Sequence, residues 1–480
     1  MAPVPSGSDS RAVVIGAGIA GLLTARVLAE HFAQVLILDR DQAPTAPLRR
    51  SGVPQGSHVH ALFARGLRAV ETLLPGFGDE LRRRGGHRID VCNDLAVATP
   101  YGWGVRFPSD LHVIGASRPL IEAVIRDRVL ALPQVSLKGR HQVDVLAGTA
   151  QHVHVVTGRD LVQGCAFEIP AALVVDATGR GSRLPHWLAD LGCAPVRETV
   201  VDAHLRYATR LYQLPVLPDE RDWRACYVMP LGPDHPRGGV LAPIEGNRWI
   251  ATLSGTGADR PSPSEDAFLP FARSLTTSCI ADALEHAEPL TPVVCSNATA
   301  NRRRHLERAT GLPDNLLVVG DAACALNPIY AQGMTVAALS ALTLSRCLAT
   351  RPRPSRTFAA RYHRRLSALH DVPWLLATTA DLSFPDADGP PPALHQRVLR
   401  PYLDRVLAAG TRNHHAQAAF LGVLNMVHHP ATLLAPHVLL STTFGHQPPT
   451  ELTPSPPQQH KDGKPDELPP PTTRLRDGHR

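Results

Sequence analysis

An α/β fold (α+β overall) is predicted from three features of the 480-residue sequence. A β-branched run leads into Gly-x-Gly-x-x-Gly near the N-terminus, two later apolar runs are followed by Asp and Gly, and a block of short alternating strands lies between those two runs. Together these features predict a Rossmann-like nucleotide-binding domain, an inserted antiparallel-sheet domain and a C-terminal helical segment.

The first feature is a complete βαβ dinucleotide fingerprint. Gly16 permits a tight turn, Gly18 lets the backbone approach a pyrophosphate, and Gly21 lets the next helix pack closely on the strand. The N-terminus of that helix offers free N–H groups and partial positive charge to phosphates. Asp39 ends the second strand, where a carboxylate accepts ribose hydroxyls, and Arg40 follows it. We predict that these residues bind a nucleotide.

Composition and charge argue against several other kinds of site. The net charge is +6, but only three of the 49 basic residues are Lys and the Arg residues are spread along the chain. The runs 82–84 and 302–304 are therefore interpreted as solvated faces, and no nucleic-acid partner is expected. Eight Cys without a C-x-x-C pair argue against a disulfide framework and a zinc site. His58-x-His60 lacks acidic or Cys companions, so no metal is expected.

The sequence also lacks the signals of export and of membrane insertion. The first ten residues have neither a basic region nor an apolar core, so no signal peptide is expected. The longest apolar stretch, 331–349, contains Gln332, Gly333 and Arg346, and is interpreted as a buried helix. These observations predict a cytoplasmic protein with no transmembrane segment.

A later strand points to a flavin rather than to a nicotinamide cofactor. The run LLVVGD ends at Gly320 and Asp321, and a carboxylate there can bind a ribityl hydroxyl. Pro328, Gly333 and Met334 then open an Ala/Leu-rich helix. Its positive N-terminus can stabilise negative charge on the N1–C2=O side of a reduced isoalloxazine ring.

Three motifs in this order resemble GxGxxG, DG and GD of the FAD-dependent aromatic-hydroxylase (group A) superfamily, over about residues 11–440, with Asp176 in the DG position. The segment GMTVA at 333–337 is similar to squalene epoxidase. A denser set of motifs is similar to the flavin epoxidases of actinobacterial polyether-ionophore pathways, which act on polyketide polyenes. That set lies at residues 52–60, 101–108, 176–182, 207–211, 243–250 and 301–303.

The resemblance implies FAD as the cofactor, with NAD(P)H or a partner flavin reductase as the source of electrons. It places Arg50, Gln55 and His58 along the flavin edge. It places Arg118 at the FAD pyrophosphate or the adenosine ribose, where a guanidinium makes bidentate contacts to phosphate oxygens. Tyr330 is expected near the reacting face of the flavin as a candidate catalytic residue.

Candidate substrate contacts come from the middle of the chain. Trp103, Phe107, Tyr207 and Trp249 fall in the expected sheet and are candidates for lining an apolar substrate cavity; the alternative is that they are ordinary core residues. Cys324 stands where many superfamily members have His, and is interpreted as a small core residue beside the FAD. No residue stands out as a general base.

The motifs predict a discontinuous cofactor domain interrupted by a substrate domain. The last segment is rich in Pro and poor in apolar residues, so it cannot bury a core. The predicted segments are 10–85, 110–185 and 296–365 for the FAD-binding domain, 86–109 and 186–295 for the substrate domain, 366–444 for the C-terminal helical segment, and 445–480 for a disordered Pro-rich tail.

The resemblance implies a FAD-dependent monooxygenase of secondary metabolism. It would epoxidise alkenes of a hydrophobic polyketide or polyene substrate by way of C4a-hydroperoxyflavin. The lack of a candidate base favours this reaction, because oxygen transfer to an alkene removes no proton from the substrate. Two alternatives stay open: a FAD-bound, non-redox [4+2] cyclase (Diels–Alderase type) acting on a polyketide polyene, and an aromatic hydroxylase.

Overall fold

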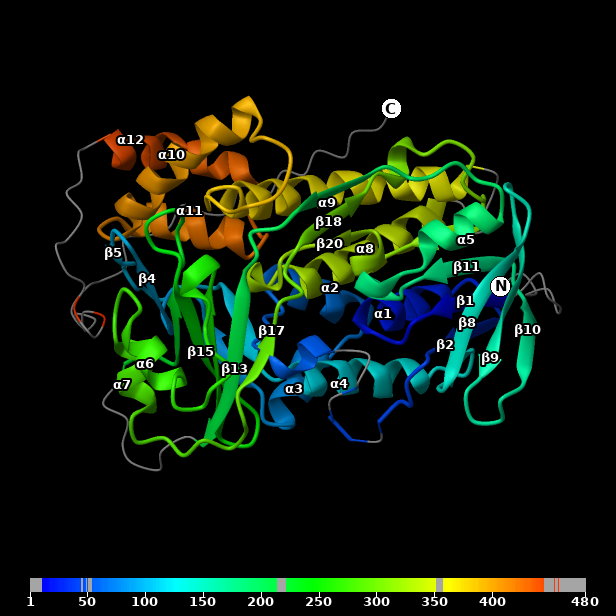
Figure 1. The fold of residues 1–480 in the computed structure, drawn as a ribbon, viewed down its shortest axis with the longest axis horizontal. Coiled ribbons are helices and arrows are strands. Elements are labelled where there is room, and N and C mark those ends of the chain that lie inside the picture. The colour runs from blue at the N-terminus through cyan, green and yellow to red at the C-terminus, as the bar shows by residue number, and fades with distance from the viewer. Residues whose placement is uncertain are drawn as a thin grey trace.

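The computed structural model of the protein confirms the predicted α/β fold (Figure 1). A five-stranded parallel sheet with its helices lies at one end of the molecule, and a seven-stranded sheet lies at the other. The C-terminal helices lie beside the seven-stranded sheet. The structure describes residues 11–44, 46–48, 50, 54–213, 222–350, 357–443, 453 and 456.

The parallel sheet has the strand order β19-β11-β1-β2-β7. It forms from short runs of Val, Ile and Leu that are buried on both faces, as the central strands of a parallel sheet require. The central strand β1 pairs in parallel with β2 and with β11. The strands are β1 (Arg11–Ile15), β2 (Gln34–Leu38), β7 (Val135–Lys138), β11 (Leu173–Asp176) and β19 (Leu316–Val318).

Helices from distant parts of the chain pack around this sheet. Helix α1 (Ile19–Leu28) contacts both α4 (Arg118–Leu130) and α8 (Gly333–Thr350). Among the described residues, α8 is the one helix long and apolar enough to cross a membrane, but 61% of it is buried inside the protein. It packs against α1, α2 (Ala64–Leu73) and α9 (Phe358–Asp381). Its apolar composition therefore matches a core helix.

A three-stranded antiparallel sheet covers one side of the nucleotide-binding part. It is formed by β8 (His141–Gly148), β9 (Val153–Asp160) and β10 (Ala166–Pro170). Helix α5 (Leu184–Asp190) joins this sheet through Trp187, whose indole N–H donates to the carbonyl oxygen of Asp144 at 3.0 Å. The short helix α3, Phe77–Arg83, packs against α4.

The seven-stranded sheet has the order β17-β13-β16-β15-β14-β4-β5. It is antiparallel as predicted except at one junction, where β4 pairs in parallel with β14. This exception arises because β4 and β5 come from a segment that precedes the rest of the sheet by more than a hundred residues. Helices α6 (Phe268–Arg273) and α7 (Cys279–Leu284) complete this part. The strands are β4 (Leu95–Thr99), β5 (Gly102–Trp103), β13 (Arg206–Gln213), β14 (Ala225–Val228), β15 (Gly238–Ile244), β16 (Arg248–Gly255) and β17 (Val294–Ser296).

Two small sheets lie where the chain passes between the larger ones. Strands β3 (His87–Asp90) and β6 (His112–Gly115) form an antiparallel pair. Strands β12 (Glu198–Val201), β18 (Asn301–Arg304) and β20 (Cys324–Ala325) form the other small sheet. Strand β20 follows the Gly320-Asp321 pair closely in the chain. This second sheet therefore connects that pair with the segment that leads into the seven-stranded sheet.

The C-terminal part consists of α9, α10 (Leu394–Gly410), α11 (His414–Leu424) and α12 (Pro436–Thr443). Most of the predicted tail, 445–480, falls outside the described residues. Its described residue Thr453 contacts the seven-stranded part: the Thr453 carbonyl oxygen accepts hydrogen bonds from the Trp103 indole at 3.1 Å and the Thr277 hydroxyl at 3.3 Å. At Thr453 the segment therefore contacts the folded body through its backbone, and the predicted disorder of the tail stays a prediction.

Helix α9 is fastened to β19 by a buried histidine. Nε2 of His363 accepts a hydrogen bond from the backbone N–H of Val318 at 3.1 Å, so the imidazole must be neutral there. Its side chain is 2% exposed, and burial lowers the pKa of His363 to about 4. This contact lies just before the Gly320-Asp321 pair, and it therefore supports one wall of the site described below.

We expect stability to fall on acidification in part through His363. Its folded pKa of about 4 lies below the unfolded value of 6.5, so the unfolded chain binds the proton more tightly and stability is lost as pH falls below 6.5. Between pH 7 and pH 5 the loss from this group is about 2 kcal/mol. His363→Gln keeps an acceptor and does not titrate. Its free energy of unfolding, measured with urea at pH 7 and at pH 5, should therefore fall by that amount less than the free energy of unfolding of the wild type.

The exposed His286 provides the control for this measurement. His286→Gln should follow the wild-type pH dependence. An equal loss of stability in the His363→Gln variant and the wild type would contradict the assignment.

Candidate functional site

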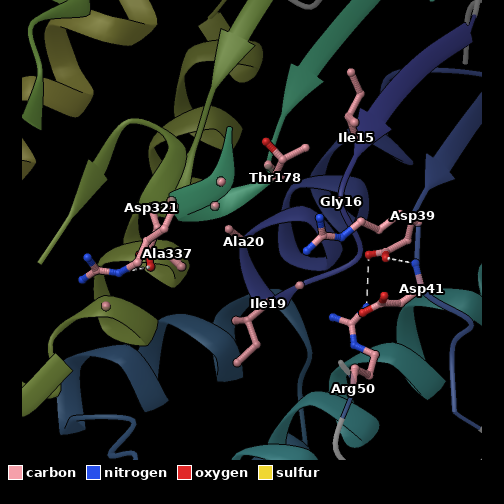
Figure 2. A pocket seen from close by; sticks show the side chains of 18 of the residues that line it. Ile15, Gly16, Ile19, Ala20, Asp39, Asp41, Arg50, Thr178, Asp321 and Ala337 are labelled. Atoms are coloured by element: carbon pink, nitrogen blue, oxygen red, sulfur yellow. Dashed lines mark hydrogen bonds and ion pairs between the residues drawn. The ribbon is translucent and has the colours of Figure 1, made fainter. Parts of the chain in front are cut away.

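A cavity of about 520 Å³ opens at the carboxyl ends of the parallel strands, where open α/β sheets bind their ligands (Figure 2). Its wall comes from the loops after β1, β2, β11 and β19, from β8 and from the start of α8. The predicted cofactor residues in this wall are Gly16, Gly18, Asp39, Arg40, Arg50, Arg118, Gly320, Asp321, Pro328, Gly333 and Met334.

The β1–α1 loop shows why its three glycines differ in role. Gly16 has φ +107°, and a Cβ there would lie 2.5 Å from the carbonyl oxygen of Ala177. A Cβ at Gly21 would lie 1.9 Å from the carbonyl oxygen of Gly16, so Gly21 supports the loop rather than lining the cavity. A Cβ at Gly18 would meet nothing within 4 Å. The open space beside Gly18 and the start of α1 at Ile19 form a cradle for an anionic group.

Asp39 lies at the end of β2 with its carboxylate already engaged. It accepts hydrogen bonds from the backbone N–H of Ala17 at 2.6 Å and of Asp41 at 2.8 Å. Arg50 pairs with Asp39 at 3.1 Å and with Glu122 at 2.8 Å. Burial acts to lower the pKa of Arg50, but the two carboxylates outweigh it and raise the pKa. These carboxylates hold Arg50 in the cavity wall at the Asp39 end, and its place along the flavin edge stays a prediction.

Arg118, at the start of α4, reaches the cavity beside His60. One guanidinium nitrogen lies 3.2 Å from Nε2 of His60, whose Nδ1 lies 2.9 Å from the carbonyl oxygen of His58. Burial, reinforced by the charge of Arg118, lowers the pKa of His60 to about 3. The neutral imidazole can thus donate from Nδ1 and accept from Arg118 at Nε2. Burial also lowers the pKa of Arg118, with partial compensation from Glu122.

Asp176 supports the cavity without facing it. Its fully buried carboxylate accepts hydrogen bonds from the backbone N–H and hydroxyl of Thr178, at 3.0 and 2.6 Å, and from the hydroxyl of Ser182 at 2.6 Å. These donors occupy its carboxylate, and a direct contact of Asp176 with the cofactor stays a prediction. Its role is to shape the turn after β11, and residues 177–181 of that turn line the cavity.

Arg180 extends from this turn toward the distal motif. Its guanidinium donates to the carbonyl oxygen of Ala300 at 2.6 Å and to that of Leu326, and its Nε lies 3.7 Å from the carboxylate of Asp321. Gly320 takes φ +59°, which turns the chain so that Asp321 points into the cavity (Figure 2). The second and third motifs therefore meet through an Arg–Asp pair.

The segment before α8 forms the floor of this end of the cavity. Pro328, Gly333 and Met334 line it, and α8 begins at Gly333. The hydroxyl of Tyr330 instead donates to the buried carboxylate of Asp381 at 2.6 Å. Burial, followed by the charge of Asp381, raises the pKa of Tyr330 well above its ordinary value. Its hydroxyl is engaged as a donor to Asp381, and a catalytic role for Tyr330 stays a prediction.

His58 lies in the junction between the two large sheets. It is 3% exposed, its Nδ1 is 2.7 Å from the hydroxyl of Thr209, and its ring meets the edge of Tyr207 with centroids 4.3 Å apart. The His58 ring therefore packs against Thr209 and Tyr207 of β13, and its place along the flavin edge stays a prediction. The side chain of Gln55 lies outside the described part of the structure.

The candidate substrate residues divide into two groups. Trp103 and Trp249 are 6% and 4% exposed and pack in the core of the seven-stranded sheet, so for them the alternative interpretation as core residues holds. Phe107 is half-buried in a cluster with Tyr227, between that sheet and α11. Tyr207 is buried beside His58. Cys324 is a buried core residue on β20, and burial raises the pKa of its thiol.

Six residues of the cavity wall that carry side-chain nitrogen donors were not predicted from the sequence as cofactor contacts: His60, His141, Gln142, Arg180, Arg183 and Trp187. His60 was considered only as half of a metal-binding pair, and Arg180 was visible only as part of the DG motif. His141 and Trp187 gave no local signal, because the β8 strand and the α5 helix approach the cavity only in the folded chain. Within the described ranges, no group of three or more His, Cys, Asp or Glu side chains is arranged to hold a metal ion.

The wall fits a dinucleotide with two phosphates. Five Arg, Arg40, Arg50, Arg118, Arg180 and Arg183, outnumber its three Asp, Asp39, Asp41 and Asp321. Three of these guanidinium groups have a buried Nε with no hydrogen-bond partner in the described part of the chain: Arg50, Arg118 and Arg180. Phosphate oxygens would satisfy such donors. The open cradle at Gly18 supplies the place for them.

Residues 9–368 match the family model of a FAD binding domain, FAD_binding_3. The chain belongs to this family. Protein Rv3254 of Mycobacterium tuberculosis is 30% identical, over 83% of this chain and 85% of that protein. Kynurenine 3-monooxygenase of Salinispora tropica is 25% identical, over 73% and 75%. The structure of the flavin-dependent brominase Bmp2 shares the fold, with a TM-score of 0.65 and 14% identity over 86% of this chain and 92% of that one.

Membership of the family establishes the cofactor class and the broad activity. The chain is a FAD-binding flavoenzyme of the monooxygenase type, within the broad superfamily that the three motifs indicated. The likeness to the brominase shows the fold alone, because the identity is low. Within the family, Asp39 and Asp321 would hold the ribose and ribityl hydroxyls, and the arginines would hold the diphosphate.

Two glycine variants should separate folding from cofactor binding. Gly18→Val places its side chain in open space, so the apoprotein should keep its melting temperature but lose FAD from the cradle. Gly21→Ala places its Cβ 1.9 Å from the Gly16 carbonyl oxygen, so it should lower the free energy of unfolding of the apoprotein by several kcal/mol. Thermal unfolding without FAD, together with FAD titration, measures both effects.

Gly78→Ala, at a helical glycine of α3 where a Cβ would meet only side-chain atoms at 3.5 Å or more, is the control for adding a Cβ within a helix. Stoichiometric FAD in the Gly18→Val variant would contradict the placement of the diphosphate.

Proposed function

We propose that this flavoenzyme transfers one atom of O₂ to an alkene of a hydrophobic polyketide or polyene substrate. The balanced reaction is alkene + O₂ + NAD(P)H + H⁺ → epoxide + H₂O + NAD(P)⁺. FAD, when bound and reduced, would supply the oxygen activation, as cofactors of this kind do. The protein's own residues bind and orient the cofactor and the substrate, and exclude water.

The observation that carries the proposal is that the cavity wall formed by the segment before α8 is largely apolar. Its wall includes Leu326, Pro328, Ala331 and Met334, which offer no titratable side chain. The titratable groups described there, Asp321 and Arg180, lie 3.7 Å apart and belong to the cofactor motifs. Transfer of oxygen to an alkene takes no proton from the substrate, so it has no need of a base at this end.

The other described groups near this end are unsuited to removing a phenolic proton. His60, with a pKa lowered to about 3 by burial and Arg118, is a weak base at neutral pH. Tyr330 has a raised pKa, and its hydroxyl donates a hydrogen bond to Asp381. Both observations favour epoxidation over ring hydroxylation.

Apolar side chains between the seven-stranded sheet and α11 support a hydrophobic substrate. This cluster includes Phe107, Tyr227 and Met229. The charge of Tyr227 is among the causes that raise the pKa of Tyr330, which supports the proximity of this cluster to the segment before α8. A long polyene could use this surface without polar partners, and its binding would follow from burial of apolar area.

An aromatic hydroxylase is the second candidate, favoured by the 25% identity to kynurenine 3-monooxygenase. A non-redox [4+2] cyclase of a polyketide polyene is the third, since a structural FAD would need the same cavity. The chain has a single GxGxxG, which the FAD would occupy. We therefore propose that NAD(P)H binds transiently or that a separate flavin reductase supplies the electrons.

Isotope labelling tests the reaction. FAD-loaded protein is incubated under ¹⁸O₂ with a linear polyene or with a phenol of similar size, in the presence of NADPH and, in a second set, of a flavin reductase with NADH. We expect the polyene to gain ¹⁸O in epoxides only when reductant and O₂ are both present. Gly18→Val, prepared without FAD, is the matched control for background oxidation.

The other outcomes identify the alternatives. A product isomeric with the polyene, formed anaerobically without reductant, would replace the epoxidase by the cyclase. Labelled hydroxyl on the phenol with no reaction of the polyene would replace it by the hydroxylase.

A further inference from the structure

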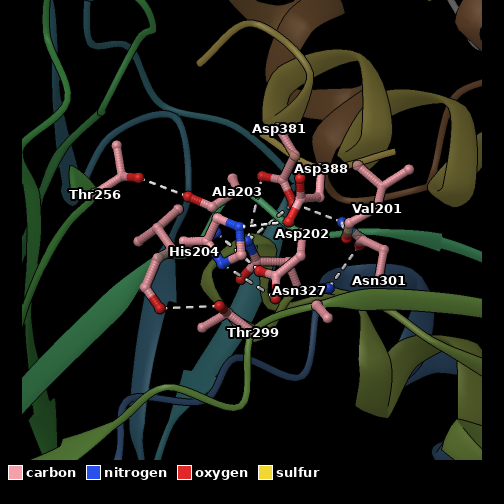
Figure 3. Close-up of polar contacts among 12 residues, drawn as sticks. Val201, Asp202, Ala203, His204, Thr256, Thr299, Asn301, Asn327, Asp381 and Asp388 are labelled. Carbon is pink, nitrogen blue, oxygen red and sulfur yellow. Dashed lines mark hydrogen bonds and ion pairs between the residues drawn. The ribbon is translucent and has the colours of Figure 1, made fainter. Parts of the chain in front are cut away.

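A buried carboxylate lies behind the segment that forms the floor of the cofactor cavity. Asp381 is the last residue of α9 and is 0% exposed. It accepts hydrogen bonds from Asn301 at 2.5 Å, from Asn327 at 3.2 and 3.1 Å, and from the hydroxyl of Tyr330 at 2.6 Å. Figure 3 shows Asp381 beside Asn301 and Asn327. The cofactor motifs do not account for this residue.

The position is unfavourable for a negative charge. Burial removes the carboxylate from water, and the C-terminal end of a helix carries partial negative charge of its own. Burial raises the pKa of Asp381 to about 6. Each of these three side-chain partners acts as a donor, which suits an ionised carboxylate that only accepts. Three donor side chains thus hold an anion in a place where it would otherwise be excluded.

The three donors converge on one segment of the cavity wall. The backbone N–H of Asn327 donates to Asn301 Oδ1 at 2.7 Å, and Asn327 Oδ1 accepts from the N–H of Ile329 at 3.2 Å. These contacts shape the short helix Pro328–Tyr330. Ala331 follows at φ +53°, a conformation that a non-glycine residue adopts only when its surroundings enforce it. Pro328 and Ala331 line the cavity on the opposite side of this segment.

We propose that Asp381 is a positioning residue that holds the segment 327–331 against the bound cofactor and thereby sets the direction of the α8 N-terminus toward the flavin. The inference depends on FAD binding and not on the substrate that is oxidised. In this role, a carboxylate outside the three cofactor motifs determines the position of a segment that lines the cofactor cavity.

The same carboxylate connects the cofactor cavity to the seven-stranded sheet. Asn301 lies on β18, and its amide also approaches the carbonyl oxygen of Val201 on β12 at 3.5 Å. Directly after β12, Asp202 and Asp388 exchange backbone hydrogen bonds at 2.8 Å, and His204 contacts Asp388 at 2.8 Å (Figure 3). The Asp381 cluster therefore lies at the strand that leads into the seven-stranded sheet.

Asp381→Asn tests the proposal, because an amide keeps the size but has one acceptor atom in place of two. With the loss of donor contacts to a charged group, we expect FAD affinity, measured by fluorescence titration of the apoprotein, to fall by about tenfold. We also expect the visible absorption band of the bound flavin to shift relative to wild type. Ser383→Ala is the matched control, because Ser383 lies close to Asp381 along the chain and its hydroxyl donates to the carbonyl oxygen of Ala380. This variant should match wild type in both readouts.

The pH profile of FAD affinity separates positioning from simple loss of packing. Protonation of Asp381 removes an acceptor, so wild-type affinity should fall as pH decreases through about 6, and the Asp381→Asn variant should lack this step. His204→Gln should retain the step, which assigns it to Asp381. The charged or titratable groups that face the cluster from other elements are Asp202, His204, Tyr227, Tyr330, Asp388 and Arg400.

Tyr330→Phe provides a second variant that keeps the two amide donors. We expect a loss of FAD affinity of about threefold in the wild-type background and none in the Asp381→Asn background, because the two residues act through one hydrogen bond. If Asp381→Asn fails to fold, the Tyr330→Phe titration and spectrum decide the matter. Unchanged affinity, spectrum and pH profile in a folded Asp381→Asn, or in Tyr330→Phe when the former is unfolded, would overturn the proposal.

Discussion

The arrangement of this molecule depends on holding several arginines close together before any phosphate is present. Like charges in a partly buried wall repel one another and lose hydration, so each needs a fixed partner. Arg50 is held by Asp39 and Glu122, Arg118 contacts a neutral His60, and Arg180 is held by carbonyl oxygens and Asp321. These partners come from the end of β2, the segment before α2, helix α4, and the segments before β18 and after β19 and β20. The anion site is therefore formed when the parallel sheet and its surrounding segments assemble.

This constraint explains why the cofactor residues are dispersed over more than three hundred positions while the cavity is compact. Parallel strands present their carboxyl ends at one edge, so residues after β1, β2, β11 and β19 meet there whatever their separation in sequence. Each strand end then needs its own device to turn the chain. Gly16 and Gly320 use positive φ, and the buried carboxylate of Asp176 orders the third turn.

The sequence predicted the parts of the site that obey backbone rules, and not the parts that depend on side chains meeting in space. Glycine spacing, strand ends and helix starts are local, and Gly18, Asp39, Asp321 and Gly333 all line the cavity. The pairing of Arg50 with Glu122, seventy-two residues later on α4, could not be read from the sequence. Tyr330 was taken for a catalytic candidate because Asp381, fifty-one residues later, gives no signal in the sequence. Trp103 and Trp249 show that an aromatic pattern in a strand cannot say which face is core.

The division between a charged cofactor cavity and an apolar neighbouring cluster also limits the chemistry. The described polar groups that face the cavity suit a cofactor: their donors match phosphate oxygens and their carboxylates match sugar hydroxyls. Polar groups on the far side of segment 327–331 bond to each other through Asp381. Under the proposed function, a substrate that enters beside Leu326 and Met334 would meet apolar side chains and the N-terminal end of α8. Orientation and exclusion of water are what such surroundings can supply, and oxygen transfer to an alkene is a reaction for which they suffice.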